Sequence, residues 1–273
     1  MGGEKDLMIY LKTIFSSDAE YPFLILNLLE SYQHIDYMLI CEANKTHTGE
    51  SRSFGFDIEK MPAPYRDKVK YIALDVAENT ILSPQNEGIC HSVNEKYIRG
   101  SFVKYVDLHD QDIVVSVDAD EVIYGHLYPH LLSEVKVKGA LQLQLHQFFY
   151  KMNYLWKNNH FIAPSVIMAS RYKNNFPMDW RYDGDLYPHI AGCHFSWCMP
   201  IGDLLIKMRN YAHAPAVREF ATRDILENAI TNKIYPFDLG RKFIIEELEY
   251  AIHSGYYPRS FLDNKTLFSP AVL

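Results

Sequence analysis

Short continuous apolar runs dominate the first half of the chain, and such runs predict strands buried on both faces of a sheet. Four stretches have this character: residues 7–15, 37–41, 69–74 and 113–117. Apolar residues at helical spacing follow Pro22, which suits a first helical turn, and Ser92 with Glu95 forms a capping box ahead of a second helix. This alternation of strands and helices predicts an α/β fold with a mainly parallel sheet.

The pattern changes at Ala140, where Leu141, Leu143 and Leu145 alternate with polar residues. Such alternation predicts a half-buried strand in an antiparallel or mixed part of the sheet. Later patterns predict strands over residues 164–169 and 190–197, a polar loop over 174–188, and helices over 127–137, 203–211, 221–232 and 243–254. Gly255 is a natural end for the last helix. No linker composition divides the chain, so we expect one domain spanning residues 1–273.

The composition narrows the possible partners. Apolar residues make up 48% of the 273, and 27 Lys and Arg against 34 Asp and Glu give a net charge of −7. No general attraction to nucleic acid or to an anionic membrane is therefore expected. The apolar runs are too short to span a bilayer, so we expect a soluble, cytoplasmic chain, with a removed anchor left open. Four cysteines without a CxxC pair predict reduced, buried thiols: Cys41, Cys90, Cys193 and Cys198.

The apolar run from Ile113 to Val117 ends in three carboxylates, Asp118, Asp120 and Glu121. In an open α/β sheet, ligands bind at the carboxyl ends of the strands, so these side chains are expected to face a ligand. Carboxylates so close together repel one another, and a divalent cation relieves that repulsion. The pattern predicts an oxygen-ligand site for Mg²⁺ or Mn²⁺ that holds the phosphates of a nucleotide; a solvated turn is the simpler alternative.

Four blocks in the same order resemble glycosyltransferase family 17, the group that includes the bisecting β-1,4-N-acetylglucosaminyltransferase of N-glycans. The blocks are residues 35–49, Glu95 with Arg99, residues 117–122, and residues 191–197 followed by Lys207 and His213. The chain departs from the family pattern at four places: residues 16–20 stand where an Asn-Glu pair is usual, Ile98 in place of glutamine, Ile123 in place of proline, and Cys193 in place of tryptophan.

The resemblance implies a GT-A-like, Rossmann-like fold: a mostly parallel central sheet with an antiparallel part, flanked by helices. Residues 1–125 would form the nucleotide-binding part and residues 126–273 the acceptor side. The implied reaction is a metal-dependent, inverting transfer of a sugar from a UDP-sugar to a glycan hydroxyl, with Mn²⁺ or Mg²⁺ stabilising the departing diphosphate.

The same resemblance implies roles for individual residues. Metal ligands would come from Asp120, Asp118 and a later histidine, His213 or His194, although His194 is equally well explained as a core residue. Nucleotide contacts would come from the loop after the second strand and from later cations: Glu42, Asn44, Lys45, Glu95, Arg99, Asp118 and Lys207. A capping box and an ion pair explain Glu95 and Arg99 without any ligand. The general base is expected to be Asp203, with Asp183 and Asp185 as rivals.

Two other functions compete with this interpretation. A phosphatase of the haloacid-dehalogenase type also places Asp-x-Asp after an apolar strand, with the first Asp as nucleophile, but its motif comes early in the chain. A carbohydrate-binding module would use the aromatic residues between Phe148 and Trp156 to stack on sugars. Core packing is the other explanation for those aromatics, and the main one.

Overall fold

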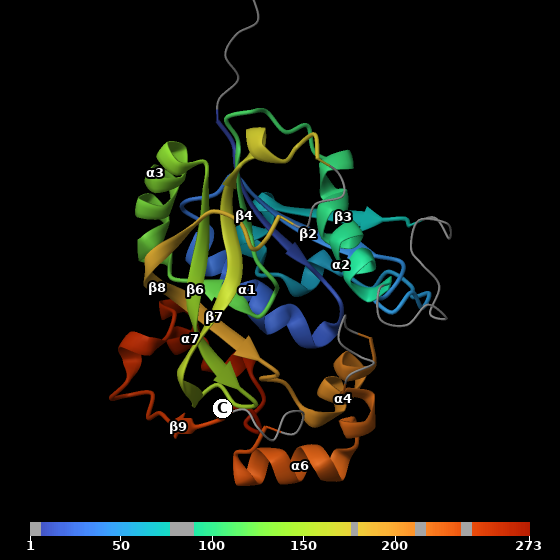
Figure 1. Cartoon of the computed structure of the whole chain (residues 1–273), viewed down its shortest axis with the longest axis vertical. Helices are drawn as coiled ribbons and strands as arrows, with labels where there is room; N and C mark the ends of the chain where they lie inside the picture. The colour runs from blue at the N-terminus through green and yellow to red at the C-terminus, as the bar shows by residue number, and fades with distance from the viewer. Residues whose placement is uncertain (1–6, 77–89, 176–179, 211–216, 236–241) are drawn as a thin grey trace, which may run out of the picture.

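The computed structural model describes residues 7–76, 90–175, 180–210, 217–235 and 242–273. Its strands form one nine-stranded sheet in the order β3-β2-β1-β4-β7-β6-β8-β5, with β9 pairing to β7 (Figure 1). Helices flank the sheet. The predicted α/β class is confirmed, with a parallel part and an antiparallel part joined between β4 and β7.

The parallel part contains the four strands that the apolar runs predict. They are β1 (Ile9–Ile14), β2 (Tyr37–Ala43), β3 (Val69–Leu74) and β4 (Ile113–Ser116). The central strand, β1, pairs in parallel with both β2 and β4. Parallel neighbours need crossover connections, which here include α1 (Tyr21–Ser31) and α2 (Cys90–Gly100). The carboxyl ends of these strands therefore lie along one edge of the sheet.

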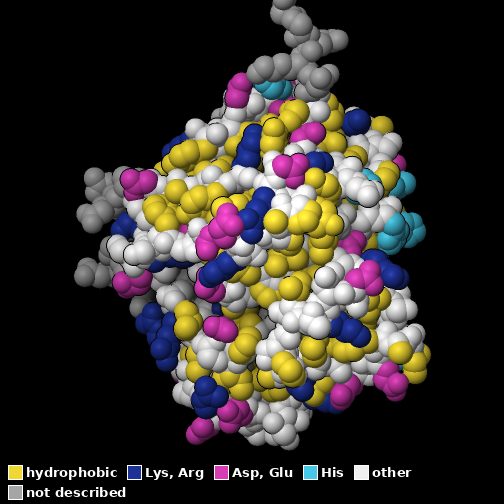
Figure 2. All heavy atoms as spheres, turned by 180° about the vertical axis from the view of Figure 1, so that it is seen from behind, with side chains coloured by type: hydrophobic (Ala, Val, Ile, Leu, Met, Phe, Trp, Pro, Cys, Tyr) yellow, Lys and Arg dark blue, Asp and Glu magenta, His cyan; other side chains and the backbone are white. Residues whose placement is uncertain are grey.

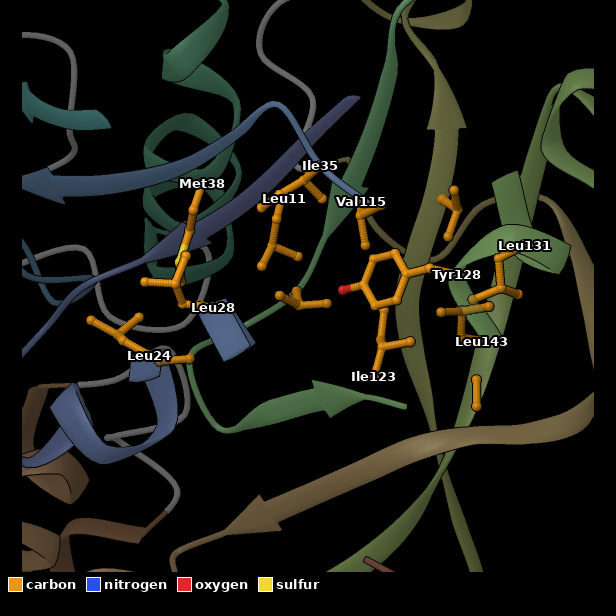
Figure 3. Close-up of a cluster of buried hydrophobic side chains, with 14 of the residues drawn as sticks. Leu11, Leu24, Leu28, Ile35, Met38, Val115, Ile123, Tyr128, Leu131 and Leu143 are labelled. Atoms are coloured by element: carbon orange, nitrogen blue, oxygen red, sulfur yellow. The ribbon is translucent and has the colours of Figure 1, made fainter. Parts of the chain in front are cut away.

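The two helices cover opposite faces of the parallel part. Leu24 of α1 packs in one core cluster with Leu11 of β1, whereas Ile98 of α2 packs in another with Tyr10. Successive residues of a strand point to opposite faces, so Tyr10 and Leu11 require helices on both sides. Figure 3 shows part of the first cluster, where Leu11, Leu24, Leu28, Met38 and Val115 are buried together. Burying each such side chain contributes about 1.5–3 kcal/mol.

The other part, which we call the antiparallel part although its β6 and β8 pair in parallel, extends the sheet on the far side of β4. Its elements are β5 (Glu121–Ile123), α3 (Tyr128–Lys138), β6 (Ala140–Phe149), β7 (Tyr154–Met168), β8 (Asp185–Ser196) and β9 (Ile245–Glu247). The remaining helices are α4 (Ile201–Asn210), α6 (Arg223–Asn232) and α7 (Arg259–Asp263). In Figure 1, α4 and α6 lie together at one end of the sheet. The alternating leucines of β6 are buried, as predicted.

Gly192 brings β8 unusually close to β5. A Cβ atom at position 192 would lie 2.1 Å from the carbonyl oxygen of Val122, a distance that no side chain can tolerate. Only glycine fits here, as is usual where the backbones of two strands approach closely. The approach lets β5, only three residues long, pair Glu121 with His194.

Three predictions of local structure are wrong: the end of the polar loop 174–188, the cap of α2 and the last helix. The loop is shorter than predicted, because β8 begins at Asp185. α2 begins at Cys90, so Ser92 lies inside the helix and is not its N-cap. The apolar spacing over residues 243–254 does not form a helix, because Ile245–Glu247 pairs as β9 with β7. Gly255 consequently ends no α-helix. Pairing with an existing strand outweighs the helical spacing of these residues.

The structure also tests the predictions from composition. The three cysteines described in full, Cys41, Cys193 and Cys198, are buried and free, as expected. The aromatics of residues 148–156 are buried, so they pack in the core and offer no sugar-binding surface. On the face in Figure 2, Lys and Arg are interspersed with Asp and Glu. None of the helices described is long and apolar enough to cross a membrane.

Candidate functional site

The acidic turn after β4 opens on a cavity of about 460 Å³. The cavity is lined by the carboxyl ends of β1 and β4, the segment after β2, α2, α4 and the end of β8. Three hydrogen bonds fix the turn: Glu121 N donates to Asp118 O, Asn27 Nδ2 of α1 donates to Ala119 O, and Phe195 N of β8 donates to Asp120 O. The expected meeting of strand ends at one edge of the sheet is observed.

Asp118 is held by two guanidinium groups. Arg99 donates to both of its oxygens, at 2.5 and 2.8 Å, and Arg181 Nη1 lies 2.6 Å from Oδ2. Burial opposes ionisation, yet Arg181 and Arg99 hold the pKa of Asp118 well below its usual range. Arg99 belongs to α2, where it also bonds Glu95, so its bonds to Asp118 tie α2 to the acidic turn. Asp118 is thus fixed in its ionised form, and its oxygens are directed at protein cations.

Glu121 is tied to the same arginine. Arg181 Nη2 donates to Glu121 Oε1 at 2.5 Å, and the backbone amide of Asp118 donates to Oε2 at 2.7 Å. A single planar guanidinium therefore bridges two carboxylates, a geometry that lysine cannot reproduce. Both Glu121 and Arg181 are almost completely buried.

Asp120 has different neighbours. Lys207 Nζ of α4 donates to its Oδ2 at 2.8 Å, while Oδ1 faces His194 Nε2 at 3.8 Å. Burial lowers the pKa of His194 to about 4, so its imidazole is neutral at pH 7. The Nδ1 atom of His194 lies 3.0 Å from Gln147 Oε1 and donates to it, which leaves the Nε2 lone pair directed at Asp120. Two electron-rich atoms thus face each other at the cavity wall.

This pair of atoms fits a divalent cation. Neutral imidazole and carboxylate are both ligands that Mn²⁺ accepts, and the hydrogen bond to Gln147 sets the tautomer as outer-shell partners of metal-bound histidines do. No three His, Cys, Asp or Glu side chains of the described residues converge as a complete ligand set. His213, the other predicted ligand, lies outside the described residues. Phosphate oxygens commonly supply the ligands that a protein leaves open.

Other cations lie close to the acidic turn. Lys12 of β1 is fully buried, 3.5 Å from Ser116 Oγ, and burial lowers its pKa to about 8. Lys45 and Arg52, from the segment after β2, line the cavity together with Lys207. The cavity therefore places cationic side chains beside its buried carboxylates.

The predicted nucleotide contacts divide into two groups. Lys45, Glu95, Arg99, Asp118 and Lys207 line the cavity. The other two, Glu42 and Asn44, are outside its lining and are bonded elsewhere. Asn44 Nδ2 donates to Asp75 and its Oδ1 accepts from Val76 N, which ties β2 to β3.

Glu42 is fully buried behind the cavity wall. Its carboxylate accepts hydrogen bonds from the Arg52 side chain, the backbone amides of Gly55 and Phe56, and the Tyr71 hydroxyl. These bonds hold the segment after β2 against the sheet, so Glu42 shapes the wall and does not face a ligand.

The three predicted bases also lie outside the cavity lining. Asp183 is bonded to Arg171 and to the Tyr172 hydroxyl. Asp185 is exposed at the start of β8, where it pairs with Leu141. His194 pairs with Gln147, which lies six residues after Leu141 on β6. Asp185 is therefore about 20 Å from His194 along the sheet. Asp203 is the third residue of α4, in its first turn, where a carboxylate is stabilised by the helix dipole.

The cavity residues that sequence reasoning missed include Arg181 and Glu20. Arg181 lies in a polar loop whose composition carries no local signal, and its partners are 60 or more residues away. Glu20 follows β1 and accepts a hydrogen bond from Ser16 N at 2.6 Å. Its position at a strand end was the available signal, because the predicted ligands at the ends of β2 and β4 were chosen on that ground.

A family model described as glycosyltransferase family 17 matches residues 4–237, most of the chain. The chain belongs to glycosyltransferase family 17. This confirms the resemblance drawn from the four sequence blocks. Membership of family 17 also argues against the phosphatase and the carbohydrate-binding module. The contacts of Asp118 agree, because both of its oxygens are bonded by arginines and neither is free to act as a phosphatase nucleophile. A search of curated proteins finds no match.

Solved structures resemble this glycosyltransferase more distantly. The galactosyltransferase LgtC, in complex with donor and acceptor sugar analogues, is 10% identical over 62% of this chain and 61% of its own, with a TM-score of 0.35. A 4-diphosphocytidyl-2C-methyl-D-erythritol synthase is 8% identical over 75% and 99%, with a TM-score of 0.40. The bifunctional glycosyltransferase WbbM is 16% identical over 53% and 24%, with a TM-score of 0.30. The match spans about three fifths of LgtC, and scores this low assign no substrate.

Proposed function

We propose that this family 17 glycosyltransferase moves a sugar from a UDP-sugar to a glycan hydroxyl, with a divalent cation and inversion at the anomeric carbon. The observation that carries the proposal is the pair formed by Asp120 Oδ1 and the neutral Nε2 of His194 at the cavity wall, 3.8 Å apart. These two atoms, with donor phosphates, would hold the cation. Bound there, a cation supplies positive charge that stabilises the departing diphosphate.

The cations of the protein complete the donor site in this proposal. Lys207 bonds Asp120 Oδ2 while His194 faces Oδ1, so its ammonium group would lie beside the cation and add charge for the diphosphate. Lys45 and Arg52 line the same cavity and add charge for the rest of the nucleotide. Asp118, locked by Arg99 and Arg181, is pre-positioned to accept a hydrogen bond from ribose without reorganising.

Glu20 is the proposed proton acceptor, in place of Asp203, Asp183 and Asp185. The other cavity-lining carboxylates of the described residues each contact a basic side chain, whereas Glu20 accepts a backbone hydrogen bond. Burial raises the pKa of Glu20 to about 7, which suits a base working near neutral pH. The acceptor oxygen attacks the anomeric carbon, its proton passes to Glu20, and the bond from that carbon to the diphosphate breaks, releasing UDP.

Ligand-dependent thermal stability tests the donor and metal assignments. UDP with Mn²⁺ should raise the melting temperature of the wild type, and Asp120→Asn should remove that rise. Asp203→Asn is the matched control, because it also neutralises a carboxylate but lies outside the cavity lining. An Asp120→Asn variant that binds UDP and Mn²⁺ as the wild type does would refute the proposed cation site at Asp120 and His194.

Product analysis tests the reaction itself. A panel of UDP-sugars, scored by Mn²⁺-dependent release of UDP, identifies the donor, and NMR of the product linkage gives its anomeric configuration. We expect inversion. A retained configuration would refute a single displacement with Glu20 as proton acceptor.

A further inference from the structure

The loop from Trp180 to Gly184 has an unusual backbone. Trp180, Tyr182 and Gly184 have φ angles of +63°, +59° and +102°. The left-handed region is costly for residues with a Cβ atom, and two bulky aromatics adopt it here within three positions. Such a conformation persists only where the surroundings over-determine it, and it is concentrated at functional sites.

Several contacts hold this loop in place. Trp180 is fully buried, with its ring 5.1 Å from that of Phe102 and 5.8 Å from that of Tyr172. Gly184 packs so closely that a Cβ atom would lie 2.3 Å from the backbone of Ala140. Between these anchors, Arg181 is pinned to Asp118 and Glu121.

Tyr182 is exposed and lines the cavity, whereas its neighbour Arg181 lines the cavity but is buried. The amide of Tyr182 donates to Ala163 O at 3.2 Å, which fixes the backbone. Its side chain remains 61% exposed while lining the cavity wall. The guanidinium of Arg181 lies 5.5 Å from the centre of the Tyr182 ring, so the ring rests on the group that holds Asp118. A large aromatic surface is thus presented to the cavity on a locked backbone.

We propose that Tyr182 is a stacking platform for a ring of the substrate, either the nucleobase of the donor or a pyranose of the acceptor. The proposal rests on the nucleotide-sugar transfer proposed above. Nucleobases and the apolar faces of pyranoses share the chemistry that an aromatic ring recognises, a flat, weakly polar face with polar groups at its rim. Because the backbone is already fixed, stacking on Tyr182 orders no loop on binding.

Three variants separate stacking from folding. Tyr182→Phe keeps the ring and should bind as the wild type does. Tyr182→Ala and Tyr182→Gly both remove it, but only glycine adopts this φ without strain, so the Gly variant should melt at a higher temperature than the Ala variant. Tyr105→Ala is the matched control, an exposed tyrosine, 52% accessible, that does not line this cavity.

The measurements are the dissociation constant for UDP with Mn²⁺, by calorimetry, and the KM for the acceptor. We expect both ring-deleting variants to weaken one of these constants about 5- to 50-fold, with Tyr182→Phe and Tyr105→Ala within twofold of the wild type. A weaker UDP affinity identifies the nucleobase as the stacked ring. An unchanged UDP affinity with a raised acceptor KM identifies the pyranose.

Two results overturn the proposal in different ways. If the wild type binds UDP with Mn²⁺ and Tyr182→Gly leaves both constants within twofold, the platform is refuted and the donor site stands. If the wild type itself binds no UDP in the presence of Mn²⁺, the proposed function fails, and this inference fails with it.

Discussion

The ends of β2 and β4 both carry buried carboxylates, yet they do different things. Glu42, at the end of β2, is bonded by the segment that follows it, through Arg52, Gly55 and Phe56, and by Tyr71 on the neighbouring strand. The carboxylates after β4 are bonded by Arg99, Arg181 and Lys207, which lie 19 to 87 residues away. The first set shapes one loop, whereas the second brings distant elements together around a cavity. Position at a strand end thus predicts where an acid lies but not its role.

The largest effect is expected at Asp120. Asp120→Ala removes the oxygen that faces His194, so turnover should fall on the order of 10²- to 10⁴-fold in protein whose thermal melt still shows a folded chain. Steady-state release of UDP measures the turnover. Near-normal turnover of Asp120→Ala would show that Asp120, like Glu42 at the end of β2, has only a structural role.

Glu42 should show the opposite result. Glu42→Ala leaves the half-buried Arg52 side chain and two backbone amides without their acceptor, which should lower the free energy of unfolding by about 2–4 kcal/mol. Urea unfolding measures this loss. At a temperature where the variant stays folded, its turnover should remain within about tenfold of the wild type. A stable but inactive Glu42→Ala variant would contradict the distinction drawn between the two strand ends.

Glu20 combines the two cases, because its bonded partner is local but its carboxylate lines the cavity. Burial raises its pKa in the folded state to about 7, so the native chain binds a proton that the unfolded chain has lost above pH 4.5. The stabilisation from this proton is fully present below pH 4.5 and is lost as the pH rises through 7. Glu20→Gln, which is permanently neutral, should therefore become more stable than the wild type by about 1–3 kcal/mol at pH 8, but not at pH 4.5.

Urea unfolding at the two pH values measures that difference, and the same variant should lose turnover on the order of 10²-fold or more as a missing base. An unchanged difference in stability across this range would show that Glu20 does not titrate there. Full turnover in Glu20→Gln would remove it from the reaction.

Arg181 gives the smallest of these effects. Arg181→Lys keeps the charge but cannot bridge Asp118 and Glu121, so Asp118 should lose part of its orientation. We expect turnover to fall about 10- to 100-fold, as is typical for partners of site residues. Arg171→Lys is the matched control, because Arg171 bonds Asp183 and both residues lie outside the cavity lining. Equal effects of the two substitutions would argue against a special role for Arg181.

The sequence predicted the parallel half of the fold well because its signals are local. The apolar run at Val69–Leu74 coincides with β3, and Pro22 correctly placed the start of α1. The C-terminal part was harder to predict. Residues 245–247 form a strand because they pair with β7, and no local pattern reveals a distant partner.

The same limit applied to the site. Asp118, Asp120, Arg99 and Lys207 were predicted from strand position and family blocks, and all four line the cavity. Arg181 was missed because a buried arginine in a polar loop looks like any surface cation. Asp183 and Asp185 were named as rivals to Asp203 because acids in such a loop look available. Availability depends on tertiary neighbours, such as the Arg171 that engages Asp183.

Gly192 has a consequence for any attempt to redesign this enzyme. It lies two residues from His194 on β8, and its contact with Val122 sets the spacing between β8 and the short strand that carries Glu121. The same spacing separates Asp120 from His194, since Phe195 N bonds Asp120 O. A methyl group at position 192 would thus lengthen the distance between Asp120 and His194, although it replaces none of the side chains that line the cavity. A comparison of site residues alone would find no difference in such a variant, although its Asp120 and His194 would no longer be close enough to share a cation.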